Sequence, residues 1–165
     1  MKIPFFTFMI LSTIHNMLSA DSLTIGSPSP QITALNDQAE VIDLGDALSQ
    51  GTTLVFFYPK AMTPGCTKQA CSLRDAWDDL KARNVQVYGV SCDKAKTQAK
   101  FKEKYKLPYT LIADKDGEVS DAFNRSRFSR HAYLFKDGQL IWRDLNASTR
   151  SQAADVLTAL DQLEK

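Results

Sequence analysis

The chain has 165 residues, of which 44% are hydrophobic and 24% are charged, and its formal net charge is +1. This length suits one domain with a substantial core, and this composition is that of an ordinary globular protein. The sequence holds no block of basic residues, which argues against nucleic acid as a partner.

The first 20 residues differ in composition from the rest of the chain. They begin with one lysine, continue as an apolar run from residue 3 to about residue 14, and end in Leu-Ser-Ala. This order is typical of a secretory signal peptide, and the apolar run is too short for a membrane-spanning helix. An amphipathic or buried N-terminal helix is the alternative. We expect residues 1–20 to be a signal peptide cleaved after about Ala20. Residues 21–165 would then form a periplasmic or secreted domain with no stable membrane association.

The next segments alternate between strand and helix patterns. Residues 22–26 and 32–44 are expected to form an N-terminal hairpin. Two buried strands are predicted at residues 52–59 (TTLVFFYP) and 84–91 (NVQVYGVS), because both are rich in β-branched and aromatic residues. An amphipathic helix is predicted between them, over residues 63–83. Such a β-α-β unit implies a parallel strand pair.

The rest of the chain continues the alternation and then ends in a hairpin and a helix. A helix is predicted at about residues 94–105 and a short strand at 109–114 (YTLIAD). The segments HAYLF (131–135) and QLIWRDL (139–145) flank an Asp-Gly turn, which is a hairpin signal. The last helix should cover about residues 150–163. We therefore expect a single α/β domain, a thioredoxin-like sandwich with an N-terminal hairpin extension.

Two of the three cysteines lie in the helix predicted after the first buried strand. Thr63 suits the N-cap position and Pro64 suits the first helical position, so Cys66 falls in the first turn. Free backbone N–H groups and the helix dipole stabilise a thiolate there, which is the setting of a nucleophile. A half-buried structural cysteine is the alternative interpretation.

The spacing of Cys66 and Cys71 is unusual for a structural disulfide. On an intact helix their Cα atoms would lie roughly 8.6 Å apart, which exceeds the roughly 7 Å reach of a disulfide. Either the helix begins later than predicted, or oxidation must unwind its first turns. In an exported protein paired cysteines normally rest as a disulfide, and an odd total leaves one thiol over. A redox pair that switches between two conformations accounts for this placement better than a structural bridge.

The segment FFYPKAMTPGCTKQACSLRD resembles the active-site signature of peroxiredoxins of the Q, or bacterioferritin-comigratory, group. Pro59, Thr63 and Cys66 match the Pro-x-x-x-Thr-x-x-Cys motif of that family. Cys71 matches the resolving cysteine that many members carry five residues later. The resemblance extends over most of residues 25–145.

The resemblance implies a cofactor-free thiol peroxidase that acts on hydrogen peroxide and organic hydroperoxides. We expect the protein to be a monomer, although the sequence leaves the oligomeric state and the preferred peroxide open. Cys66 would be the peroxidatic cysteine and form a sulfenic acid, and Cys71 would condense with it to give a disulfide. Thr63 would orient the thiolate and the peroxide, and Pro59 would shield the site. A thioredoxin-like dithiol reductant would then restore both thiols. Because many relatives are cytoplasmic, the export signal leaves the identity of this reductant open.

The resemblance also implies an arginine that stabilises the Cys66 thiolate. Arg130 is the expected residue because it precedes an aromatic residue by three positions, as in the family. Arg125 and Arg127 are close alternatives in the sequence. Ala132 departs from the family, which usually has Ser or Thr at this position.

Two further residues allow other interpretations. His131, together with Cys66 and Cys71, suggests an exported Sco-like copper-binding protein, which would belong to a different functional class on a similar fold. Sco-like proteins carry a Cys-x-x-x-Cys pattern, with three residues between the cysteines. Four residues separate Cys66 and Cys71, so we prefer the peroxidase interpretation. Cys92 is expected to be a small buried hydrophobic residue, with an accessory redox role as the alternative.

Overall fold

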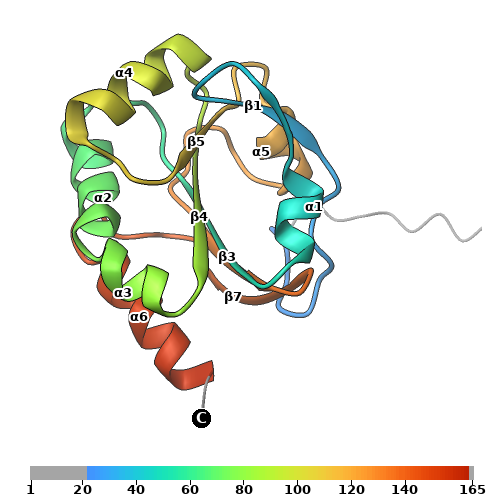
Figure 1. The fold of residues 1–165 in the computed structure, drawn as a ribbon. Helices are drawn as coiled ribbons and strands as arrows, with labels where there is room; N and C mark the ends of the chain where they lie inside the picture. The colour runs from blue at the N-terminus through green and yellow to red at the C-terminus, as the bar shows by residue number, and fades with distance from the viewer. Residues whose placement is uncertain (1–21, 164–165) are drawn as a thin grey trace, which may run out of the picture.

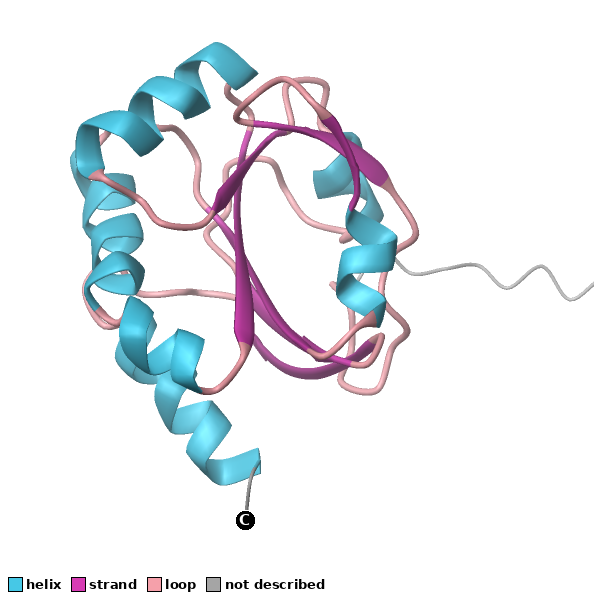
Figure 2. Ribbon diagram, in the orientation of Figure 1, coloured by secondary structure: helices cyan, strands magenta, loops and turns pink. Residues whose placement is uncertain are grey.

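A seven-stranded mixed sheet with helices on both faces forms the domain (Figure 1) (Figure 2). The computed structural model describes residues 22–163, so the predicted signal peptide lies outside the described residues. The strands are β1 (Thr33–Asn36), β2 (Val41–Asp43), β3 (Thr52–Phe57), β4 (Val85–Ser91), β5 (Thr110–Ala113), β6 (Ala132–Lys136) and β7 (Gln139–Asp144). The helices are α1 (Leu44–Ser49), α2 (Pro64–Asp75), α3 (Trp77–Ala82), α4 (Ala95–Tyr105), α5 (Glu118–Ala122) and α6 (Gln152–Leu163).

The centre of the sheet is the β-α-β unit that the sequence predicts. The strand order is β2-β1-β5-β4-β3-β6-β7, and β3 pairs in parallel with β4, as β4 does with β5. β6 lies on the other side of β3 and runs antiparallel to it, and the hairpin of β6 and β7 completes that edge. These pairings confirm the α/β thioredoxin-like prediction. Within residues 22–163, no helix is both long enough and apolar enough to cross a membrane.

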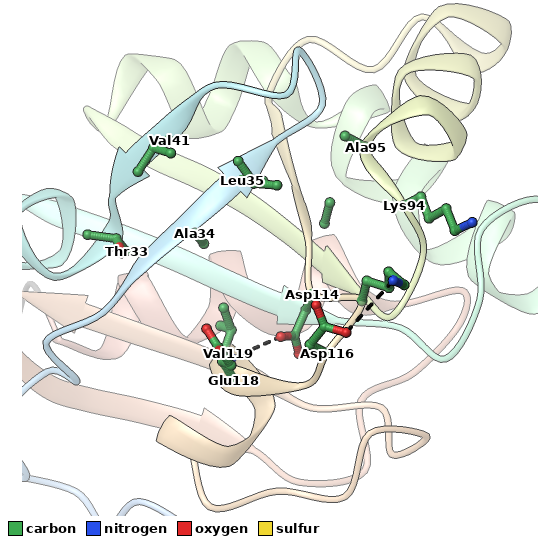
Figure 3. A pocket seen from close by; sticks show the side chains of 12 residues that line it. Thr33, Ala34, Leu35, Val41, Lys94, Ala95, Asp114, Asp116, Glu118 and Val119 are labelled. Carbon is green, nitrogen blue, oxygen red and sulfur yellow. Dashed lines mark hydrogen bonds and ion pairs between the residues drawn. The ribbon is translucent and has the colours of Figure 1, made fainter.

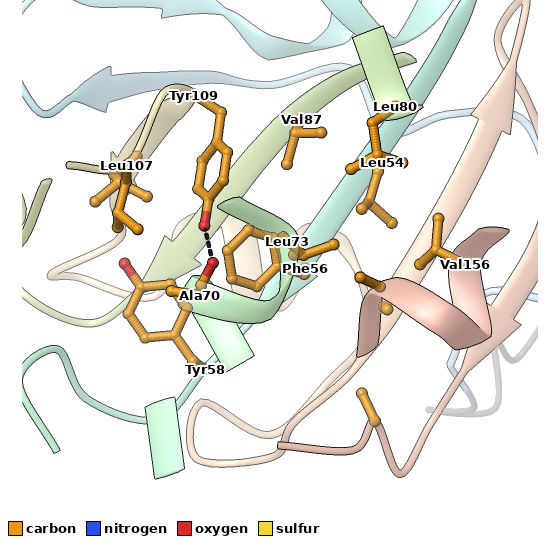
Figure 4. Close-up of a cluster of buried hydrophobic side chains, with 14 of the residues drawn as sticks. Leu54, Phe56, Tyr58, Ala70, Leu73, Leu80, Val87, Leu107, Tyr109 and Val156 are labelled. Carbon is orange, nitrogen blue, oxygen red and sulfur yellow. Dashed lines mark hydrogen bonds between the residues drawn. The ribbon is translucent and has the colours of Figure 1, made fainter. Parts of the chain in front are cut away.

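Two hydrophobic clusters hold the helices against the two faces of the sheet. The first cluster packs α2, α3, α4 and α6 on one face, and Figure 4 shows its centre around Phe56, Leu73 and Val156. In this cluster the Tyr109 hydroxyl donates a hydrogen bond of 2.7 Å to the Ala70 carbonyl of α2 (Figure 4). α1 and α5 lie on the opposite face of the sheet (Figure 1). The second cluster packs them there, around Phe57 and other aromatic rings. Alternate residues of β3 therefore serve different clusters, as the period of a strand requires.

The N-terminal hairpin is shorter than predicted. It is confined to β1 and β2, where the Asn36 side chain accepts the backbone N–H groups of Gln38 and Glu40, each at 2.9 Å. This side-chain turn closes the hairpin locally. Residues 22–26 are not part of it, because that segment runs beside β7, with Gly26 N–H donating to the Leu140 carbonyl.

The predicted helix over residues 63–83 is divided into α2 and α3 at Ala76, where φ is −98° and ψ is 14°. The short helices α1 and α5 are absent from the prediction. Asp43 is the N-cap of α1 and accepts the Asp46 N–H at 2.8 Å. The N-cap of α5 is Gly117, and Asp114, which precedes it, accepts the Val119 N–H at 2.9 Å. The capping aspartate Asp43 is the sequence signal that would have indicated α1.

Candidate active site

The two cysteines of the motif lie on one continuous helix, and both are free thiols. Cys66 is in the first turn of α2 and is 1% exposed, whereas Cys71 is half-buried. The helix is intact from Pro64 to Asp75, so it does not begin later than predicted. Because an intact helix keeps residues i and i+5 beyond disulfide reach, the two sulfurs cannot bond in this conformation.

The loop between β3 and α2 is fixed by a buried polar network. Asp93 accepts the Ala61 backbone N–H at 2.7 Å and the Ser91 hydroxyl at 2.8 Å. Gln98 donates to the Ser91 hydroxyl and accepts from the Tyr58 hydroxyl at 2.6 Å. Burial raises the pKa of Tyr58, which keeps this hydroxyl a neutral donor. The loop is therefore tied to the carboxyl end of β4, a contact between distant segments that no local sequence signal indicates.

Thr63 occupies the predicted N-cap position but does not cap the helix with its side chain. Its φ of −78° and ψ of 152° are those of an N-cap, and its carbonyl accepts the Thr67 N–H. The hydroxyl instead donates to the Lys60 carbonyl at 2.9 Å, which tightens the preceding loop. The predicted N-cap position of Thr63 is therefore confirmed, and its side chain makes no capping hydrogen bond. Pro59 is half-buried at the start of the same loop.

Arg130 is the arginine that reaches Cys66. Its Nη2 lies 3.5 Å from the Cys66 Sγ, and its Nη1 donates to the Gln69 Oε1 one turn further along α2. The antiparallel pairing of β3 and β6, with Phe56 opposite Ala132, brings these segments together from 64 residues apart in the chain. The guanidinium is therefore placed to donate a hydrogen bond to the Cys66 sulfur. Arg130 and the start of α2 therefore form a site suited to a reactive thiolate.

The other two arginines have different partners. The guanidinium of Arg125 lies 4.1 Å from the centre of the Phe57 ring and donates to the Ser120 hydroxyl, in the second cluster. Burial lowers the pKa of Arg125 to about 10. Arg127 donates to the Asp116 carbonyl. Of the three candidates, the structure brings only Arg130 to the thiol of Cys66.

His131 is turned away from the cysteines. Its Nδ1 is 2.8 Å from the Tyr133 hydroxyl, which belongs to the second cluster, whereas Cys66 belongs to the first. Burial, reinforced by the charge of Arg125, lowers the pKa of His131 to about 4. Within the described part of the chain, no group of three His, Cys, Asp or Glu side chains is arranged for a metal ion. His131 therefore does not join Cys66 and Cys71 in the copper site that the Sco-like interpretation requires.

The two remaining thiols are held in their neutral form. Burial raises the pKa of Cys71, and the nearby Arg74 offsets only part of this effect. Burial also raises the pKa of Cys92, with a further contribution from Asp114. The prediction that Cys92 is buried is wrong: it is half-buried where the chain leaves β4, and its Sγ lies 3.7 Å from the Arg127 carbonyl.

A hollow of about 500 Å³ lies elsewhere on the domain (Figure 3). It is bounded by the β1–β2 hairpin and by the starts of α4 and α5, with Leu35, Val41 and Lys94 among its lining residues. The lining includes none of the residues predicted for the site.

Comparison with known proteins places the chain in a family. A model of the AhpC/TSA family matches residues 25–141. The chain belongs to the AhpC/TSA family of peroxiredoxins. This peroxiredoxin is 40% identical over 113 residues to a protein of Coxiella burnetii named "Putative peroxiredoxin bcp", covering 66% of this chain and 74% of that one. It is 45% identical over 101 residues to "Peroxiredoxin Bcp" of Escherichia coli, covering 61% of this chain and 64% of that one.

Solved structures show the same fold. The peroxiredoxin resembles "Peroxidoxin BcpB" of Mycobacterium tuberculosis with a TM-score of 0.78 and 27% identity, over 85% of this chain and 97% of that one. A mutant of Xylella fastidiosa PrxQ gives a TM-score of 0.80 at 20% identity, over 88% and 99% of the two chains. Named peroxiredoxins at 40% to 45% identity make this chain a peroxidase of the oxidoreductase class.

Replacing Arg130 with alanine should slow the oxidation of Cys66 by peroxide at least about tenfold, equivalent to about 1.4 kcal/mol of barrier. The physical reason is the loss of the cation that lies 3.5 Å from the Cys66 Sγ. Stopped-flow oxidation gives the rate, and the pH profile of Cys66 alkylation should move to higher pH. The matched controls are Arg125→Ala and Arg127→Ala, which should leave that pH profile in place. Equal slowing by all three substitutions would contradict the assignment of Arg130.

The half-buried thiol of Cys71 should ionise at a higher pH than an ordinary thiol while α2 is folded, because burial raises its pKa. A raised pKa in the folded state means that folded α2 is favoured while Cys71 is neutral, and that this advantage is lost as the pH rises through that range. We expect alkylation of Cys71 in a Cys66→Ser variant to have a higher pH midpoint in the native protein than in urea. Mass spectrometry of the Cys71 peptide separates it from Cys92. Identical midpoints in the two solvents would show that burial in α2 does not control this thiol.

Proposed function

We propose that the protein reduces hydrogen peroxide and organic hydroperoxides by thiol chemistry at Cys66. The observation that carries this proposal is the Arg130 guanidinium 3.5 Å from a buried thiol in the first turn of α2. The Cys66 thiolate attacks the terminal peroxide oxygen, the O–O bond breaks, and the departing alkoxide or hydroxide takes a proton. Cys66 becomes a sulfenic acid and the peroxide is reduced to an alcohol or water.

In this proposal the loop before α2 prepares the site for peroxide. Thr63 orients the thiolate and the incoming peroxide, and Pro59 shields the thiol from bulk water. Both residues lie on the loop that Asp93 holds through the Ala61 N–H. That fixed loop supports their roles, because a positioning group is effective only when its own backbone is restrained.

Cys71 resolves the sulfenic acid in the second step. Its thiolate attacks the Cys66 sulfur, an S–S bond forms, and hydroxide leaves and is protonated to water. The roughly 8.6 Å between these positions on a helix means that α2 must open first. Because both cysteines belong to one chain, this step needs no second copy, which supports a monomeric catalytic cycle.

A thioredoxin-like dithiol reductant closes the cycle by thiol–disulfide exchange. It reduces the Cys66–Cys71 disulfide and is itself oxidised to a disulfide. The N-terminal pattern of a signal peptide supports a periplasmic or secreted location after cleavage near Ala20. In that location the reductant is an exported or membrane-linked dithiol protein and not the cytosolic one.

The cysteine assignments are tested by two substitutions. Cys66→Ser should abolish peroxide reduction, because no other thiol of the described residues lies beside Arg130. Cys71→Ser should still consume one equivalent of peroxide and retain Cys66 as a sulfenic acid. Trapping with dimedone followed by mass spectrometry identifies the oxidised residue. Sustained turnover by Cys66→Ser would sink the proposal.

Hydrogen exchange on the reduced and oxidised forms tests whether α2 opens. Amides from Lys68 to Arg74 should be protected in the reduced protein, where α2 is intact, and should exchange quickly in the oxidised protein. The amides of β4 are the internal control, because its parallel pairing with β3 does not involve α2. Equal protection of α2 in both forms, with the Cys66–Cys71 bond verified by mass spectrometry, would mean that the disulfide forms without unwinding.

A further inference from the structure

Two buried glutamines connect Arg130 to the C-terminal helix. Gln69 of α2 and Gln152 at the start of α6 are both completely buried. Gln69 Oε1 accepts a hydrogen bond from Arg130, and its Nε2 donates one of 2.8 Å to the Gln152 Oε1. A guanidinium can only donate, so Arg130 determines which end of the Gln69 amide faces it. The other end must donate, and Gln152 supplies the acceptor.

Burial of the Gln152 side chain lowers the stability of the core. Its own Nε2 is buried and has no hydrogen-bond partner among the described residues. A buried unpaired donor destabilises a fold, and an apolar residue at the same place would avoid that cost. The contribution of Gln152 is therefore its oxygen, which fixes the orientation of the Gln69 amide.

The segment before α6 contacts the same arginine. The Ala147 N–H donates to the Arg130 carbonyl at 3.0 Å, so this segment holds the backbone of the residue as well. Further along, the Ala153 N–H donates to the Ser72 hydroxyl of α2 at 3.0 Å. The start of α6 thus makes two separate polar contacts with α2, and only the one through Gln152 continues to Arg130.

We propose that Gln152 is a positioning residue for peroxide reduction, which holds Gln69 so that Gln69 holds the Arg130 guanidinium beside Cys66. It does not touch the peroxide. The inference rests on the proposed function of Cys66 and extends its machinery to α6. Because Gln69 lies between the two cysteines on α2, opening of the helix breaks this chain of hydrogen bonds and releases Arg130 from the site.

Gln152→Met, which keeps the volume and removes the acceptor, should slow the oxidation of Cys66 by about fivefold, the effect of one lost hydrogen bond. The pH profile of Cys66 alkylation should move to higher pH. The matched control is Ser72→Ala, which removes the other contact between α2 and α6. Its thermal stability should fall while its rate and pH profile stay those of the unmodified protein. If Gln152→Met does not fold, Gln152→Asn withdraws the acceptor by one methylene and should show the same two changes.

A double-mutant cycle with Arg130→Ala decides whether Gln152 acts through the arginine. Adding Gln152→Met to Arg130→Ala should produce no further slowing. A full fivefold loss in the Arg130→Ala background, or an unchanged rate for Gln152→Met alone, would overturn the inference. The proposed function fails differently, because it is refuted if the unmodified protein does not consume peroxide or if Cys66→Ser remains active.

Discussion

The approach of the Arg130 guanidinium to the Cys66 thiol is the contact on which the rest of the site depends. The two residues are 64 positions apart in the sequence, and the antiparallel pairing of β6 with β3 brings their segments together. Arg125 and His131 pack instead against the rings of Phe57 and Tyr133, which belong to the second cluster on the opposite face. Arg130 reaches the thiol because it lies two residues before β6, next to the strand pair, whereas Arg125 and Arg127 lie further back in the loop after α5.

The helix that carries Cys66 is stable enough to hold the site and is held by contacts that can be released together. Tyr109 donates to the Ala70 carbonyl, Leu73 is buried in the first cluster, and α6 is attached through Gln152 and Ser72. Each hydrogen bond of this kind contributes about 1 kcal/mol net. In the proposed cycle, opening of α2 therefore costs several such contacts, and formation of the disulfide must offset them. The contacts that stabilise folded α2 in the reduced protein therefore also oppose the opening of α2 that the disulfide requires.

Much of this arrangement could be predicted from the sequence, because the informative signals are local. The apolar runs that become β3 and β4, the Thr-Pro start of α2 and the Asp-Gly turn before β7 all act over a few residues. What could not be predicted depends on contacts between distant segments. The Thr63 hydroxyl donates to the Lys60 carbonyl and not to a helix N–H group. Cys92 is only half-buried after the end of β4. The Gln152 side chain is buried and accepts a hydrogen bond from Gln69. A glutamine at a helix start has no local property that distinguishes it from a solvent-exposed one, so only the packing of α6 on α2 reveals it.

In the proposed cycle Cys66 must be reactive and Cys71 unreactive while α2 is folded, and their positions on this one helix provide both conditions. Cys66 lies in the first turn, with the Arg130 guanidinium 3.5 Å from its sulfur. Cys71 lies more than one turn further, where burial raises its pKa and keeps it a poor nucleophile. Opening of α2 removes both conditions at once, because Cys71 loses its burial while Cys66 leaves Arg130. In the proposed cycle, Cys71 therefore becomes reactive only after Cys66 has moved away from Arg130. Attack on peroxide and formation of the disulfide then take place in two different conformations of α2.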